Sequence, residues 1–141
     1  MEITEFNNGI YPISLYVITE PDMNGIADRF YQMTKEGDMV EFETKRRIGP
    51  IATVVDCYEK SDKQSGAMCL IWKKREMNKD IMAHEASHIA SLMFEKLGIE
   101  IDGFYGSSND PFAYLIGWAV RCIDGVINSK KPKAVVDGDK L

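Results

Sequence analysis

The sequence predicts an α+β domain in which a small, mostly antiparallel sheet packs against two consecutive helices. Strand-like segments rich in aromatic and β-branched residues crowd the first half of the 141-residue chain. Two long stretches with helix start and stop signals follow them. The expected order is strand, helix, two or three strands, then two helices, which is typical of an α+β domain.

The N-terminal half is expected to supply a strand, a helix and a short strand. Residues 11–19, "YPISLYVIT", predict the first strand because aromatic and β-branched residues dominate them. Residues 25–35 predict a helix, since apolar side chains recur there at helical spacing and Gly37 ends the pattern. Residues 39–44 alternate apolar and polar side chains, which indicates a short strand.

A β-hairpin is expected next, from residues 50–60 and 67–74 with the turn-rich "SDKQSG" between them. The second strand is apolar on both faces at its centre, so helices should cover at least one face. Three cysteines without a C-x-x-C pair argue against a disulfide framework and a cysteine zinc knuckle. Cys57 and Cys69 are therefore interpreted as small buried hydrophobes in a reducing compartment.

A long helix is predicted from the residues after Asn78 to Leu97. Asn78 is a favourable N-cap, Asp80 suits the positive end of the helix dipole, and Gly98 ends the helix. Apolar residues occur nearly all round this segment, which predicts a largely buried helix.

A second helix is predicted over residues 112–128. Asp110 would cap it and Pro111 would take its first position.

Composition places the chain among globular proteins, with 45% hydrophobic and 28% charged residues. A single domain over residues 1–128 with a flexible tail over 129–141 is expected. The formal charge is 17 minus 22, or -5, which argues against a nucleic-acid binder. Two basic clusters, residues 45–47 and 73–75, are interpreted as solvated strand ends.

A cytoplasmic protein without membrane association is expected. The N-terminus lacks the basic and apolar regions of a secretory signal. The longest apolar run, residues 112–120, is far too short to span a bilayer and is followed by Arg121.

The predicted long helix holds both histidines of the chain, His84 and His88, on either side of Glu85 in "HEASH". Residues four apart share a helix face with a rise of about 6 Å between them, so two imidazoles can reach one metal ion. Zinc lowers the pKa of a bound water to about 7, and a neighbouring carboxylate can accept its proton. The pattern therefore predicts a Zn²⁺ site with His84 and His88 as ligands and Glu85 as general base. The alternative is a chance match on a structural helix, but a buried helix would make unpartnered imidazoles costly.

A catalytic zinc needs a third protein ligand, and a carboxylate must supply it because no third histidine exists. Asp110 is the expected ligand and Asp102 the alternative, while Asp110 as a plain helix cap is the competing interpretation. Tyr114 or Tyr105 could stabilise an oxyanion, although ordinary packing also explains each of them.

These residues resemble the zincin metallopeptidases, specifically the small gluzincin-like ones. "HEASH" matches their H-E-x-x-H motif, and an acid on the following helix matches their third-ligand position. The segment "DPFAYLIGWAV" also resembles small zincin-like proteins carried by phages and mobile elements. The resemblance covers residues 67–128. It implies a minimal zincin core in which residues 67–74 line the cleft and pair with an extended peptide.

The chain departs from the family patterns at three points. Asp110 stands where gluzincins have glutamate, and Tyr114 lies four residues after it rather than three as in aspartate-type zincins. Ser91 and Phe94 occupy the glycine and third-histidine positions of the metzincin extension.

The expected function is zinc-dependent hydrolysis of peptide bonds in a peptide or protein substrate. The alternative is a non-catalytic zincin-like accessory protein of phage or mobile-element origin that binds or assembles. A third alternative is a purely structural helix.

Overall fold

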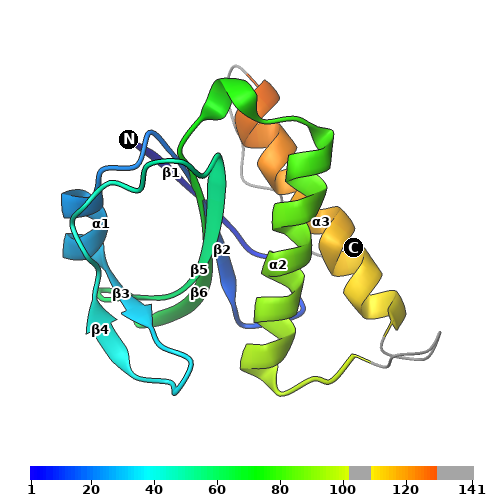
Figure 1. The fold of residues 1–141 in the computed structure, drawn as a ribbon. Coiled ribbons are helices and arrows are strands. Elements are labelled where there is room, and N and C mark those ends of the chain that lie inside the picture. The colour runs from blue at the N-terminus through cyan, green and yellow to red at the C-terminus, as the bar shows by residue number, and fades with distance from the viewer. Residues whose placement is uncertain (102–108, 130–141) are drawn as a thin grey trace.

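The computed structural model describes residues 1–101 and 109–129 of the chain (Figure 1). Its strands are β1 (Glu2–Phe6), β2 (Ser14–Thr19), β3 (Phe30–Met33), β4 (Met39–Glu41), β5 (Ala52–Glu59) and β6 (Gln64–Ile71). Its helices are α1 (Met23–Arg29), the single 3-10 turn η1 (Lys74–Glu76), α2 (Lys79–Leu97) and α3 (Asn109–Asn128).

The six strands form one sheet in the order β1-β2-β6-β5-β3-β4. Among the described residues β2 and β6 run parallel, and every other neighbouring pair is antiparallel. The predicted α+β fold with a mostly antiparallel sheet is thus confirmed. Figure 1 shows α1 on one side of the sheet and the pair α2 and α3 on the other.

Alternation along β6 explains why both faces of the sheet are covered. Ala67, Cys69 and Ile71 belong to the core under α2 and α3, whereas Met68 and Leu70 belong to the core on the α1 side. Helix α2 lies on β5 and β6, and α3 packs along α2. Cys57 and Cys69 are free and buried as expected, and Cys122 is free and buried as well.

Helix α2 has the predicted bounds because the residues that start and end it act through contacts within their own turns. The Asn78 side chain accepts a hydrogen bond from the backbone N–H of Ile81 at 2.9 Å. Gly98 follows the helix in the left-handed region with φ 70°, a conformation that glycine adopts without steric cost.

One face of α2 is buried and the other is exposed. The buried apolar side chains lie toward the sheet and α3: Met82, Ala86, Ile89, Ala90, Met93 and Phe94. The two histidines lie on the exposed face. The expectation of a largely buried helix is therefore wrong for the histidine face. That face carries only small residues beside the histidines, Ala83 and Ser87, and they are exposed.

Two N-terminal expectations need correction. The helix expected at residues 25–35 ends at Arg29, since Phe30 is already extended and pairs with Glu59 of β5. The segment expected as the first strand contains β2, and β1 precedes it. The predicted strand at residues 39–44 is confirmed in part as the short β4.

Helix α3 begins at Asn109, so Asp110 lies in its first turn and does not cap it as expected. A buried stripe at helical spacing packs it against α2: Leu115, Trp118, Ala119, Cys122, Ile123 and Val126. No helix within the described ranges is long and apolar enough to cross a membrane. The tail expected at residues 129–141 lies outside the described residues except for Ser129.

Candidate metal centre

His84 and His88 project side by side from the exposed face of α2. Their Nε2 atoms are 3.1 Å apart and their ring planes meet edge to face. Two nitrogens bound to one tetrahedral zinc at about 2.0–2.1 Å stand about 3.3–3.4 Å from each other. At the observed separation one imidazole can donate to the other, or both can direct lone pairs at one cation. The pair therefore fits zinc with only a small change in geometry.

Glu85 differs from its two neighbours because it turns toward the sheet. Its side chain is 7% exposed, and among the described residues its carboxylate has no hydrogen-bond or ion-pair partner. Burial raises the pKa of this carboxyl, while the nearby His84 and His88 act to lower it. Glu85 also lines the groove described next, so its carboxylate is placed to meet a ligand, water or ion there.

The histidine pair opens onto a groove between α2 and the first half of β5. This groove has a volume of about 490 Å³ and is lined by Ala52, Val54 and Asp56 from the strand and by His84, Glu85 and His88 from the helix.

The first half of β5 is a free sheet edge on the side away from β6. Strand β3 pairs with β5 only over Cys57–Glu59. Backbone groups of successive residues point alternately to the two neighbours, and Ile51 accepts from Trp72 on the β6 side. The N–H and C=O groups of Ala52, Val54 and Asp56 therefore point to the open edge. None of these N–H groups has a hydrogen-bond partner in the described part of the chain.

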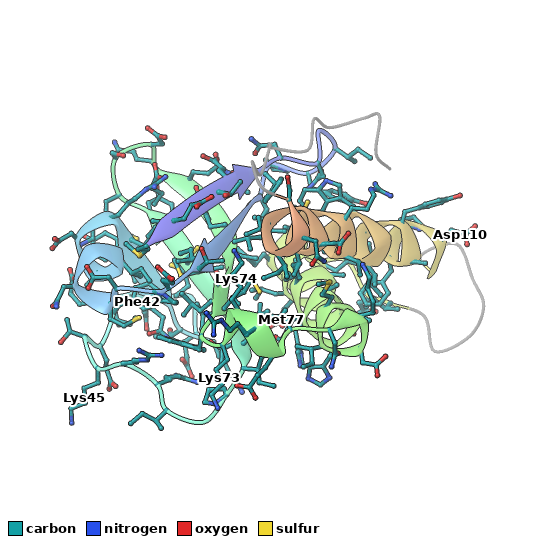
Figure 2. All side chains as sticks on the ribbon, turned by 90° about the horizontal axis from the view of Figure 1, so that it is seen from above. Phe42, Lys45, Lys73, Lys74, Met77 and Asp110 are labelled. Atoms are coloured by element: carbon teal, nitrogen blue, oxygen red, sulfur yellow. The ribbon has the colours of Figure 1, made fainter. Side chains whose placement is uncertain are left out.

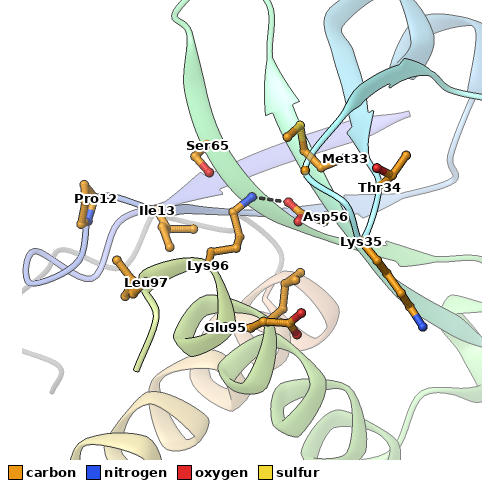
Figure 3. Close-up of a pocket in the computed structure, with 12 residues that line it drawn as sticks. Pro12, Ile13, Met33, Thr34, Lys35, Asp56, Ser65, Glu95, Lys96 and Leu97 are labelled. Carbon is orange, nitrogen blue, oxygen red and sulfur yellow. Dashed lines mark hydrogen bonds and ion pairs between the residues drawn. The ribbon is translucent and has the colours of Figure 1, made fainter. Parts of the chain in front are cut away.

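A second hollow of about 560 Å³ adjoins the groove and shares Asp56, Leu92 and Glu95 with it. Figure 3 shows Lys96 of α2 reaching across to the Asp56 carboxylate, with which it forms an ion pair. Lys96 also donates to the backbone oxygen of Gly66 at 3.1 Å. Burial raises the pKa of Asp56, and Lys96 acts to lower it. The pair ties α2 to the middle of the sheet.

The other predicted site residues lie apart from this groove. Asp110 is exposed in the first turn of α3, and it does not line the groove (Figure 2). Tyr114 is 63% exposed and borders a different hollow next to Tyr11. Asp102 and Tyr105 lie outside the described residues. Within residues 1–101 and 109–129, no three His, Cys, Asp or Glu side chains gather in a way that could hold a metal ion. The roles of Asp110 and Tyr114 stay predictions.

The strand expected to line the cleft was assigned wrongly. Residues 67–74 overlap β6, which is paired with β2 on one edge and β5 on the other and offers no free edge. The groove is lined by β5 instead, because the short β3 leaves half of β5 uncovered.

Sequence reasoning also missed Asp56, Lys96 and Arg47 as residues of this region. Asp56 gave a usable signal, since it continues the alternation of Ala52 and Val54 and so falls on the helix-covered face of the strand. A carboxylate at such a position needs a cationic partner, which Lys96 provides.

Comparisons with known proteins find no protein-family model, no curated protein and no solved structure that matches this chain. A function must therefore be argued from the side chains of the groove.

Proposed function

We propose that this protein is a zinc-dependent metallopeptidase of the zincin type that acts on a peptide or protein substrate in the cytoplasm. One observation carries the proposal: Glu85, a residue 7% exposed with no partner among the described residues, lines the same groove as His84 and His88, whose Nε2 atoms are 3.1 Å apart. Because Glu85 lines the groove, its carboxylate can reach a molecule bound there and accept a proton from it.

His84 and His88 would hold the metal in this proposal, with Asp110 as third ligand and Asp102 as the alternative. Asp110 lies in the first turn of α3 and does not line the groove, and Asp102 lies outside the described residues. Zinc, when bound, supplies a Lewis acid that polarises a carbonyl and lowers the pKa of water.

Glu85 acts as the general base. Its carboxylate accepts a proton from the water whose oxygen forms a bond to the peptide carbonyl carbon. The same carboxyl then donates that proton to the amine nitrogen as the C–N bond breaks, so protons balance over the cycle. The raised pKa of Glu85 suits both steps, because burial makes its carboxylate a stronger base than an exposed one.

The free half of β5 provides a place for the substrate backbone. An extended peptide can add as a strand to the open N–H and C=O groups of Ala52, Val54 and Asp56. A peptide bound in this way runs through the groove past His84 and His88.

Metal content and hydrolysis, measured on the same purified proteins, test the proposal. We expect about one zinc per chain, as in mononuclear catalytic sites. Glu85→Gln should keep the zinc and lose hydrolysis of a peptide library by at least about 100-fold. His84→Ala should lose both, whereas Ser91→Ala, which removes another exposed groove side chain, should keep both. A wild-type protein that binds no zinc contradicts the proposal.

Two further variants examine the predicted third ligand and oxyanion group. Asp110→Ala should lower zinc occupancy if Asp110 is the ligand, and Asp102→Ala should do so if Asp102 is. Tyr114→Phe should lower kcat while zinc content stays constant if the Tyr114 hydroxyl stabilises the oxyanion.

A second candidate is a non-catalytic zincin-like accessory protein of phage or mobile-element origin that binds or assembles through this groove. The position of Asp110 outside the groove favours it. Zinc and peptide binding with no cleavage of the library would favour this candidate, and cleavage abolished by Glu85→Gln would exclude it.

A further inference from the structure

Two basic segments far apart in the sequence lie side by side at one end of the sheet. The first is residues 45–47, on the connection from β4 to β5, and the second is residues 73–75, between β6 and α2. The backbone oxygen of Ile51 accepts from the N–H groups of Trp72 and Lys73 at 2.9 and 3.1 Å, which holds the two connections together. We call the six side chains the basic surface: Lys45, Arg46, Arg47, Lys73, Lys74 and Arg75. Figure 2 labels three of them, Lys45, Lys73 and Lys74.

The basic surface is poorly neutralised by the protein itself. Its six residues are all exposed, and only Lys73 has an ion-pair partner among the described residues, Glu76 at 4.0 Å. The acidic side chains that line the same hollows are fewer: Glu20, Glu41, Glu43 and Glu76. The exposure of all six residues agrees with their interpretation as solvated positions, and it leaves a local excess of positive charge on a chain with a net charge of -5.

The basic surface is continuous with the groove. Arg46 lines one hollow with Lys73 and Lys74, and it lines a second one with Arg47. Arg47 in turn lines the groove that holds His84 and His88. Positive charge therefore stands at the Ala52 end of the groove, where the N-terminus of α2 adds its partial positive charge.

We propose that the basic surface binds an acidic segment of the peptide that occupies the groove. The substrate would then carry carboxylates beside the residues that lie against β5, on the side nearest Ala52. This inference rests on the proposed function for the identity of the groove. Charge complementarity of this kind speeds encounter and selects partners.

The local side chains favour an acidic peptide over a nucleic acid. The aromatic residues that line the same hollows, Phe42 and Trp72, are each 6% exposed and so present no face on which bases could stack. The acidic balance of the whole chain also opposes a polyanion that would extend beyond the basic surface.

Binding to the Glu85→Gln protein tests the inference without cleavage. The probe is a fluorescein-labelled peptide with a strand-forming segment flanked by a run of glutamates, and its partner has glutamines in place of the glutamates. We expect the glutamate peptide to bind at least about tenfold more tightly at low salt, with the difference shrinking as salt is added.

Lys74→Glu/Arg75→Glu should weaken binding of the glutamate peptide by about tenfold and leave the glutamine peptide unchanged. Lys63→Glu/Arg121→Glu is the matched control, since it makes the same charge change at two exposed sites that line neither hollow of the basic surface. Equal effects of the two double variants, or no preference for the glutamate peptide, would overturn the inference. The inference would also be overturned if a single- or double-stranded oligonucleotide bound more tightly than the glutamate peptide and if Lys74→Glu/Arg75→Glu abolished that oligonucleotide binding.

The outcomes separate this inference from the proposed function. If the protein binds the glutamate peptide as expected but holds no zinc, the basic surface stands as a peptide site and the metallopeptidase proposal is contradicted. If the protein cleaves peptides equally well with and without flanking glutamates, the metallopeptidase proposal stands and the inference about the basic surface is contradicted.

Discussion

Neighbouring residues of the H-E-x-x-H segment have opposite environments. His84 and His88 are exposed, whereas Glu85 is 7% exposed. Adjacent positions on a helix point about 100° apart, so the histidines stand at the rim of the groove while the glutamate faces the sheet. A chance match on a surface helix has no reason to bury the glutamate, and this difference gives the motif its weight.

The burial of Glu85 makes a first prediction about stability. Glu85→Gln should raise the free energy of unfolding of the metal-free protein by about 1 kcal/mol at pH 7, because a neutral amide is less costly to bury than a charged carboxylate. Urea denaturation in the presence of a chelator measures this difference.

Glu95→Gln is the control for that measurement, since Glu95 is an exposed carboxylate on the same helix. It should change the free energy of unfolding by less than about 0.5 kcal/mol. If Glu85→Gln destabilises the protein instead, the carboxylate has a partner beyond the described residues, and the argument for an unpartnered base is lost.

At the scale of the element, the feature that matters most is the half-covered strand β5. It pairs with β6 along its whole length and with β3 only over Cys57–Glu59. The sequence predicted this strand but not its open half, because the extent of a free edge depends on the length of a neighbour that is distant in the chain.

The second prediction concerns amide hydrogen exchange along β5. The amides of Ala52, Val54 and Asp56 should exchange at least about tenfold faster than those of Thr53 and Val55, which point to β6. Exchange followed by NMR resolves the individual amides. Uniform protection along the strand would mean that another segment covers the edge, and strand addition of a peptide would then be excluded.

The same elements show which local structure can be read from sequence. Helix α2 was predicted with its bounds because Asn78 and Gly98 act on their own turns. Residues 30–33 carry a helical pattern but form β3, because pairing with β5 and β4 outweighs local propensity. Strand β1 was missed for a related reason, since it depends on β2 for its hydrogen bonds.

The third prediction concerns the link between α1 and β5. Arg29 at the end of α1 donates to Glu59 at 2.6 and 2.9 Å, and the Glu59 side chain is 2% exposed. Burial acts to raise the pKa of Glu59, but hydrogen bonds with Arg29, Asp62 and Ser61, together with the charge of Arg29, outweigh it and lower this pKa below its ordinary value of 4.5. The stabilisation is therefore complete above pH 4.5 and is lost as the pH falls through the lower, folded-state pKa.

Glu59→Gln should thus cost about 1 kcal/mol of unfolding free energy at pH 7, and this difference from wild type should shrink as the pH falls below about 4. Glu41→Gln removes the partner of Lys60 at an exposed site and should cost less than about 0.5 kcal/mol at either pH. Urea denaturation at both pH values checks the pair. If the loss of unfolding free energy in Glu59→Gln grows in acid, the Arg29–Glu59 ion pair is not the source of this stabilisation.

At the scale of the whole molecule, the groove lies between the sheet and helix α2, and the sequence could not predict how these two layers lie against each other. His84, Glu85 and His88 were found from their spacing on one helix. Asp56 and Arg47, which line the same groove, lie 28 and 37 residues before His84 in the chain and are brought there by the sheet topology. The two basic segments were noticed in the sequence, but only the hydrogen bonds between Ile51 and residues 72–73 show that they form one surface.

Lys96 and Asp56 hold these layers together. The Lys96 side chain is 12% exposed and the Asp56 side chain 23%, and Lys96 also donates to the Gly66 backbone in β6. Lys96→Met keeps most of the side-chain volume but leaves the Asp56 carboxylate without its cation. We expect it to cost about 2 kcal/mol of unfolding free energy, somewhat less than a fully buried pair would, because Asp56 retains contact with solvent.

Lys79→Met is the matched control for this last prediction. Lys79 also joins α2 to another element, through Asp124 of α3 at 2.7 Å, but the two side chains are 72% and 37% exposed. The control should change stability by less than about 0.5 kcal/mol. Since Asp56 lines the groove, Lys96→Met should also lower affinity for a groove-bound peptide, whereas Lys79→Met should not. Urea denaturation and fluorescence anisotropy measure both quantities, and equal results for the two variants would show that the Lys96 ion pair neither joins the layers nor shapes the groove.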